Sequence, residues 1–197
     1  MSVKSLVQSS LTNSHSVNSM LGRYESNYFH HLETVRLSSS ASSITFSNLE
    51  RYADFQHLQI RGVSRSTGAV NEDTQVIRFN GDSGTNYASH YLYGVSGTPS
   101  AGVYGTSVTY AQSTLIPGAN IATGIFAPIL MDIVDPFSSN KYKTLKTLSG
   151  YTGSAIFIKT GLWMSLSPIT SIQLFSPSGY SLSAGSRLSL YGFKASA

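Results

Sequence analysis

The chain contains no cysteine, which excludes disulfide bonds, thiol catalysis and zinc sites built on cysteine. Charged residues are also scarce: they make up 11% of the 197 residues, against about 25% in an ordinary soluble domain. Serine, threonine, glycine and tyrosine take their place. Such a composition is typical of proteins that work outside cells or pack into large assemblies.

Long hydrophobic runs are missing as well. The longest, Ile125 to Val134, is interrupted by Pro128 and Asp132 and is too short to cross a bilayer. The residues after Met1 lack the apolar core of a signal peptide. We therefore expect a protein that is made in the cytoplasm, is not inserted into a membrane and leaves the cell by lysis.

The balance of charge is mild. The formal net charge is +4, from 13 Lys and Arg against 9 Asp and Glu, and the basic residues are scattered apart from one cluster, Lys141 to Lys146. A nucleic-acid site needs a concentrated basic stripe, so we expect no nucleic-acid partner. The cluster either protects a strand edge with lysines or contacts an acidic partner surface.

The chain divides into two parts. Residues 1–28 are rich in serine and asparagine and low in hydrophobicity, which predicts an N-terminal arm that is flexible alone or ordered by a partner. Residues 29–197 show short alternating segments separated by turn residues and no helical period, as in a β-sandwich. We expect an all-β fold, an antiparallel β-sandwich that is jelly-roll-like. The expected strands are 32–37, 44–46, 55–63, 75–80, 87–93, 103–110, 125–134, 142–148, 155–164 and two more after Pro168.

The last two strands are expected to form a hairpin within Ile169–Phe193. Ile172 and Leu174 alternate with polar or aromatic neighbours on the first strand, and Leu188 and Leu190 do so on the second. Glycine and proline between them provide turn chemistry. A terminal strand of this kind is expected to lie inside a sheet, because its backbone groups need partners.

Three tyrosines are the candidate site. Tyr87, Tyr91 and Tyr93 fall on one face of their strand, with Ser89 between them. Tyrosine gives a large contact area at low entropic cost, so this stripe could stack on a host glycan or anchor a protein interface. The alternative is a half-buried sheet face, since tyrosine favours strands.

No constellation indicates catalysis. His30 and His31 are adjacent and point to opposite faces of a strand, while Asp132 and Asp135, a spacing that could serve a glycosidase, sit at a turn. Gly81–Gly84 lacks the strand-to-helix setting of a nucleophile turn, and Asp82 with Asn86 falls short of a calcium loop. We expect no catalytic residue, no metal and no cofactor.

Several segments in order resemble a family of small structural proteins of tailed bacteriophages. The resemblance covers residues 32–193 and rests on the segments SITFSNL (43–49), FQHLQIR (55–61), RS (65–66), FNGDSGTNY (79–87), GLW (161–163), ITSI (169–172) and AGSRLSLYGF (184–193). The family pattern has a proline between the second and third of the expected strands, and this chain has none there.

The resemblance implies a phage virion protein with a jelly-roll-like domain, found in tail fibres, baseplates and head surfaces. It implies a non-enzymatic structural role, assembly with other virion proteins and with copies of itself, plausibly as a trimer, and release of the virion by lysis. Head decoration and a tail appendage both fit. The alternative function is a carbohydrate-binding lectin that recognises a receptor, or a polysaccharide depolymerase.

Overall fold

A computed structural model describes residues 29–95, 98–152 and 155–194; the predicted arm, residues 1–28, lies outside this part. The described chain is built almost wholly of β-strands. A 3-10 helix, η1 (Leu49–Tyr52), occupies the segment in which the resembled family has a proline. The strands are β1 (Phe29–Arg36), β2 (Ser43–Phe46), β3 (His57–Ser64), β4 (Glu72–Phe79), β5 (Tyr87–Val95), β6 (Thr98–Val108), β7 (Ala111–Pro117), β8 (Ala127–Val134), β9 (Lys143–Gly150), β10 (Ile156–Trp163), β11 (Ile172–Phe175) and β12 (Arg187–Phe193).

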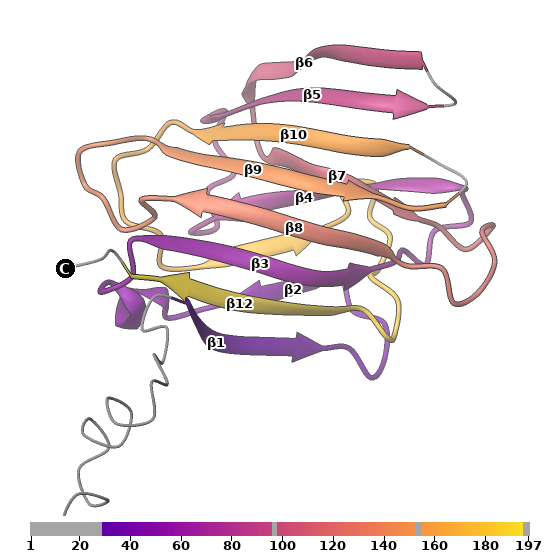
Figure 1. The fold of residues 1–197 in the computed structure, drawn as a ribbon, viewed down its shortest axis with the longest axis horizontal. Coiled ribbons are helices and arrows are strands. Elements are labelled where there is room, and N and C mark those ends of the chain that lie inside the picture. Colours follow the sequence, from indigo (N-terminus) through magenta and orange to yellow (C-terminus); the bar gives the residue numbers. More distant parts are fainter. Residues whose placement is uncertain (1–28, 96–97, 153–154, 195–197) are drawn as a thin grey trace, which may run out of the picture.

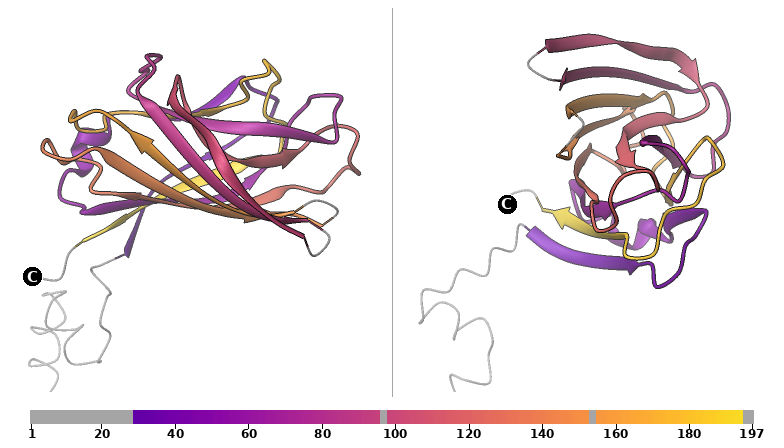
Figure 2. Two further views of the ribbon diagram at one scale, coloured as in Figure 1. Left: turned by 90° about the horizontal axis from the view of Figure 1, so that it is seen from above. Right: turned by 90° about the vertical axis from the view of Figure 1, so that its right-hand side faces the viewer.

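The strands form two antiparallel sheets packed as a sandwich (Figures 1 and 2), which confirms the predicted fold class. The large sheet has the order β1-β12-β3-β8-β9-β10-β5-β6, and the small sheet has the order β2-β11-β4-β7. The chain passes from one sheet to the other after β1, β2, β3, β4, β6, β7, β10 and β11. Repeated crossing of this kind is typical of jelly rolls.

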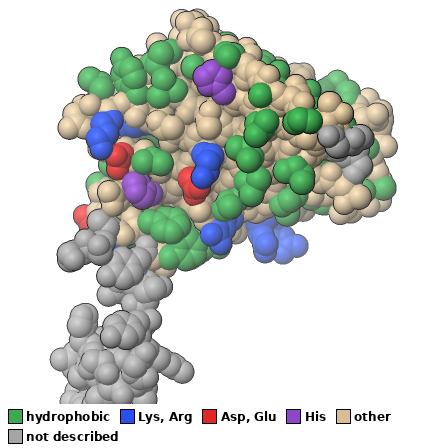
Figure 3. Space-filling view, turned by 45° about the horizontal axis from the view of Figure 1, so that its top comes forward, with side chains coloured by type: hydrophobic (Ala, Val, Ile, Leu, Met, Phe, Trp, Pro, Cys, Tyr) green, Lys and Arg blue, Asp and Glu red, His purple; other side chains and the backbone are tan. Residues whose placement is uncertain are grey.

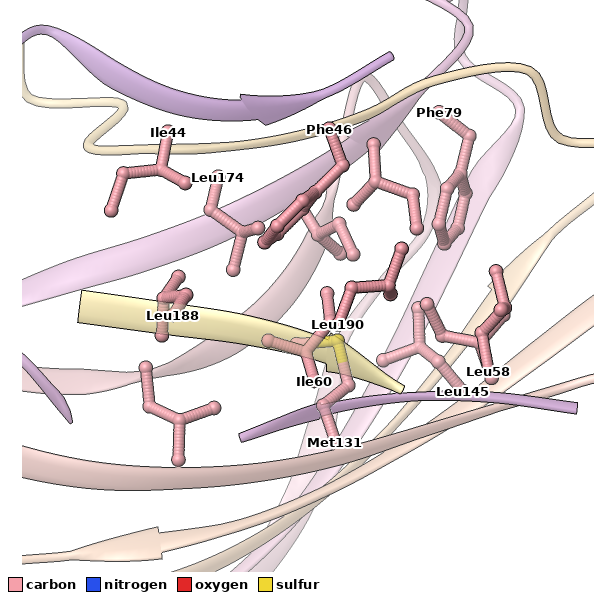
Figure 4. Packing of buried hydrophobic residues seen from close by; sticks show 14 of the residues in the cluster. Ile44, Phe46, Leu58, Ile60, Phe79, Met131, Leu145, Leu174, Leu188 and Leu190 are labelled. Carbon is pink, nitrogen blue, oxygen red and sulfur yellow. The ribbon is translucent and has the colours of Figure 1, made fainter. Parts of the chain in front are cut away.

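The core lies between the sheets and takes alternate residues from both (Figure 4). Leu58 and Ile60, which alternate with polar residues in the sequence, are fully buried on β3. The large sheet also contributes Met131, Leu145, Leu188 and Leu190, and the small sheet contributes Ile44, Phe46, Ile77, Phe79, Ile172 and Leu174. Full burial of one such side chain is worth about 1.5–3 kcal/mol, so this interface is the main source of stability.

The two sheets differ greatly in width. With strands about 4.8 Å apart, four strands span about 14 Å and eight span about 34 Å. The small sheet ends at β7, which packs mainly under β10 and β9. Figure 1 shows β5 and β6 at the top of the large sheet, beyond β7. The inner side of the large sheet is therefore covered by strands in its middle and only by side chains near β6.

Trp163 marks the centre of the aromatic core. Its ring lies 5.5 Å from that of Phe79 and 6.4 Å from that of Tyr87. The indole Nε1–H donates to Asp82 Oδ2 at 2.7 Å. The Tyr87 hydroxyl accepts from the Phe79 N–H at 3.0 Å and donates to the Asp82 carbonyl at 3.2 Å. These bonds fasten the β4–β5 turn to β10.

The predicted C-terminal hairpin is wrong. β11 pairs with β2 and β4 in the small sheet, whereas β12 pairs with β1 and β3 in the large sheet. The glycine-bearing segment between them crosses the sandwich, with Leu182 bridging to Ala41 and Ser66. The second expectation is confirmed, because β12 lies inside a sheet. Turn residues mark a change of direction and do not specify which sheet the next strand joins.

Two further details differ from the predictions. A proline within a strand predicts a bulge or an edge position, but Pro128 is the second residue of the interior strand β8 and pairs with Val63. This position is close to a strand start, where proline is tolerated. The expected strands include none between residues 110 and 125, where the structure has β7. This strand carries Gln112, Ser113 and Thr114, whose burial breaks the usual apolar–polar alternation.

The lysine cluster does not protect a strand edge, because β9 lies between β8 and β10. Lys143 is buried, with Nζ 5.9 Å from the centre of the Trp163 ring and donating to the Lys141 carbonyl at 2.9 Å. Burial lowers the pKa of the Lys143 ammonium. Lys146 faces the other side, near Asp132.

In the described part of the chain, no helix is long and apolar enough to span a membrane.

Gly62 provides a test of this packing. A Cβ at Gly62 would come 1.9 Å from the Arg187 carbonyl oxygen on the neighbouring β12, whereas a Cβ at Gly94 of β5 would meet no atom within 4 Å. We predict that Gly62→Ala lowers the free energy of unfolding by about 3 kcal/mol, as overpacking does, while Gly94→Ala leaves it nearly unchanged. Urea unfolding followed by circular dichroism measures both. Equal stability of the two variants would contradict the β3–β12 contact.

Candidate functional site

The side chains of β10 alternate in an unusual sense. Phe157, Lys159, Gly161 and Trp163 face the small sheet, so Ile156 and Ile158 face away from it. Successive residues of a strand must point to opposite faces. Because Trp163 has to reach the core, the strand places a lysine inside and two isoleucines on the surface.

The outer face, meaning the side of the large sheet turned away from the small sheet, carries a row of aliphatic residues across adjacent strands. The strand register pairs Ala101 with Leu92, Leu92 with Ile158, Ile158 with Leu148 and Leu148 with Leu130. We call these five residues the aliphatic row. Leu92, Ile158 and Leu148 are each more than 40% exposed. Figure 3 shows hydrophobic side chains gathered on this face.

A shallow apolar pocket adjoins the row. Its volume is about 600 Å³, and its lining includes Pro128, Leu130, Leu148, Gly150 and Ile156. Gly150 pairs directly with Ile156 and contributes only backbone to the lining. Ile156 is 68% exposed, more than any other large hydrophobic residue in the described ranges. The pocket and the row together make one apolar surface.

Polar groups border this surface. Asp132 Oδ1 accepts from Gln59 Nε2 at 2.5 Å, and Gln59 Oε1 accepts from Arg61 Nε. Lys146 Nζ lies 4.0 Å from Asp132 Oδ2. Arg61 pairs with Leu130 and so ends the row on β3. An apolar centre with a polar rim is the anatomy of a protein–protein interface.

The three predicted tyrosines face the inner side of the large sheet and have different environments. Tyr87 is fully buried in the core, so the prediction of a surface contact is wrong for this residue: its ring fills the space beside Trp163. Tyr91 and Tyr93 are half-buried, with ring centres 5.6 Å apart, and Tyr93 packs on Phe157 at 5.8 Å. Of the three, these two have surface available to a partner.

Lys159 lies in the same region and is only 3% exposed. Its Nζ donates to Gln112 Oε1 of β7 at 3.0 Å and lies 5.5 Å from the centre of the Phe157 ring. Burial lowers the pKa of the Lys159 ammonium to about 8, and the negative charge of Glu72 opposes this shift. Burial of a charged ammonium lowers the stability of the fold. The burial of Lys159 is therefore a consequence of the alternation on β10 that places Trp163 in the core.

The carboxylates considered for chemistry are held in separate structural contacts. Asp82 accepts from Trp163, from the Gly84 N–H at 2.8 Å and from Asn86, and the Trp163 bond is the main cause of its lowered pKa. Asp135 binds Lys141 at 2.6 Å, apart from the bonds of Asp132. Among the described residues, no three His, Asp or Glu side chains are placed to bind one metal ion.

The comparisons with known proteins add little. The sequence matches no protein-family model and no curated protein sequence. Among solved structures, the chain shows similarity to "Structure of alginate lyase Aly36B", with 10% sequence identity, a TM-score of 0.27 and coverage of 90% of both chains. A similarity at this level supports no conclusion about the function of this chain.

The aliphatic surface was missed at the level of sequence. The segment AIFIKTGLWM has apolar residues at both parities, and Tyr87–Tyr93 offered the more obvious aromatic stripe. One signal was present. If Phe157 and Trp163 face the core, the alternation of a strand places Lys159 on the same face and leaves Ile156 and Ile158 on the outer face.

Lys159 generates a prediction on pH. An unfolded lysine keeps its proton up to its ordinary pKa of 10.5, whereas folded Lys159 loses it near pH 8. Between these values the unfolded chain binds more protons, so the free energy of unfolding rises with pH across this window. We predict that Lys159→Met removes the contribution of Lys159 to this rise, leaving only that of buried Lys143, and increases stability at pH 7 by up to about 3 kcal/mol.

Urea unfolding at pH 7, 8, 9 and 10 measures the effect. Lys146→Met, which removes an exposed lysine from the neighbouring strand, is the control and should keep the wild-type dependence on pH. If Lys159→Met has the same pH dependence as the wild type between pH 8 and 10, the lysine is not buried in its charged form.

Proposed function

We propose that this protein is a non-enzymatic structural component of a tailed-phage virion. It is a surface or appendage module, either a tail-fibre or baseplate component or a head decoration protein, and it assembles with copies of itself and with neighbouring virion proteins. The observation that carries the proposal is the exposed aliphatic row with its pocket. The assignment to a phage virion rests on the sequence resemblance to structural proteins of tailed phages.

The chemistry of the outer face favours a protein partner. Aliphatic side chains gain from contact with other apolar surfaces through the hydrophobic effect, and they offer no hydrogen bonds to a sugar. A strand-paired row is also flat, as needed when sheets pack face to face. Contiguous apolar patches of this kind mark interaction sites.

The location in the virion is tested by labelling intact particles of the virus that encodes this chain with a specific antibody and gold. Label over the head supports decoration, and label on the tail supports an appendage. Particles without label under conditions that label a known virion protein would contradict the proposal.

The aliphatic row can be tested by placing charges on it. We predict that Ile158→Lys with Leu148→Lys abolishes incorporation into particles, because lysines would have to be desolvated at the interface. The matched control is Thr34→Lys with Ser189→Lys, a directly paired couple on β1 and β12, which places the same charges on the large sheet away from the aliphatic row. Co-sedimentation of tagged protein with particles measures incorporation.

Both double variants should have a free energy of unfolding within about 1 kcal/mol of the wild-type value in urea unfolding, since the substituted residues are on the surface. Equal incorporation of the two variants would exclude the aliphatic row as the assembly surface.

Carbohydrate recognition is the second candidate, and the partial exposure of Tyr91 and Tyr93 favours it. Adjacent tyrosine rings can stack on sugars. The structural proposal predicts no retention of the protein on a glycan array. Retention that is lost in Tyr91→Ala with Tyr93→Ala, but kept in the exposed-tyrosine control Tyr142→Ala, would favour a lectin; released oligosaccharide would favour a depolymerase.

A further inference from the structure

The apolar surface of the outer face has a projecting side chain directly beside a hollow. Ile156 stands 68% exposed at the rim of the pocket that Pro128, Leu130, Leu148 and Gly150 help to line. A projection next to a hollow is self-complementary under a two-fold rotation, because each copy then presents its projection to the hollow of the other. Isologous interfaces are built from one patch in this way.

We propose that the outer face binds the same face of a second copy of this chain about a two-fold axis, with Ile156 of each copy entering the pocket of the other. The inference rests on the proposed function, since it names the first partner of the assembly surface. The apolar contact is formed by the aliphatic rows of both copies, packed as two sheets about 10 Å apart.

The strand register of this face allows one two-fold alignment that fits both the pocket and the row. An axis parallel to the strands, running between β9 and β10, places Ile156 of one copy over Gly150 of the other, because these two residues pair across that line. The same axis places Ile158 over Leu148 and Leu92 over Leu130. Lys146 then lies over Thr160 and Asp132 over His90, so like charges do not face each other in this alignment.

The edges of the large sheet are less suited to self-association than its face. The edge strand β6 has Pro99 and two irregularities in its register with β5. The edge strand β1 has an irregularity between His31 and Glu33, and an ion pair between Glu33 and Arg51 at 3.1 Å. Proline, bulges and charges are the usual protection of edge strands against pairing, and the outer face has no such protection over the aliphatic row.

A face-to-face contact also selects the number of copies. Each copy covers the apolar surface of the other, so the assembly closes at two. A trimer, which the sequence resemblance implies, needs two different patches on each copy. The described part of the outer face supplies one patch, in which projection and pocket adjoin.

Analytical ultracentrifugation of the purified full chain tests the inference. We expect a monomer–dimer equilibrium that Ile156→Ser weakens by about tenfold or more, as at an interface hot spot. Thr160→Ser, on the same strand and the same face, is the control and should dimerise like the wild type. A wild-type chain that stays monomeric at high concentration, or that forms trimers, overturns the inference.

A mixing experiment tests the two-fold pairing itself. Ile158→Lys and Leu148→Asp should each dimerise poorly alone, because each places an unpaired charge against an aliphatic side chain of the other copy. An equimolar mixture of the two variants should dimerise more tightly than either variant alone, since the introduced ammonium of one chain then faces the introduced carboxylate of the other. Mixing cannot repair a defect confined to one folded chain, so failure of the mixture to dimerise, with both variants folded by circular dichroism, overturns the proposed alignment.

These outcomes are separable from failure of the proposed function. A monomeric protein that is still labelled on particles removes the dimer and leaves the virion role. A dimer that is absent from particles removes the virion role and leaves the dimer.

Discussion

The position of Trp163 in the core is the constraint on which the surface of this protein depends. Its ring packs on Phe79 and Tyr87, and its N–H binds the Asp82 carboxylate. Successive side chains of a strand point to opposite faces. A shift of β10 by one residue would therefore turn both Trp163 and Phe157 away from the core. The native parity carries Lys159 inward and Ile158 outward. The aliphatic row is thus a consequence of how the core is built.

The unequal sheets explain how the inward lysine is tolerated. Lys159 lies where β7, the last strand of the small sheet, meets the inner side of β10, and there Gln112 supplies an acceptor. Beyond β7, tyrosine side chains cover the inner side of the large sheet in place of strands. Tyr91 lies against Gly102 of β6, and the hydroxyls of Tyr104 and Tyr110 are 3.1 Å apart. Side chains with polar ends suit this position, because water reaches it from one side.

The sequence allows the strands and much of the core to be predicted, because period-two patterns such as Leu58 and Ile60 or Leu188 and Leu190 appear in it directly. It does not predict which sheet β11 and β12 join, since that depends on pairing with β2, β4, β1 and β3, all distant in the chain. The aliphatic row is hidden for the same reason. Its members come from five strands, and only the register across the sheet places them side by side.

Features that discourage association between copies are unevenly distributed over the surface, and this distribution bears on function. A chain with few charges has little electrostatic repulsion between copies to prevent association, and its exposed strand edges would be hazards. Here the two edges of the large sheet carry irregularities, a proline or charges, while the centre of the outer face carries aliphatic residues framed by Lys146, Asp132 and Arg61. Association is thereby discouraged at the edges and directed to one flat face. That arrangement is what an assembly module needs, because a particle requires its subunits to bind in one orientation.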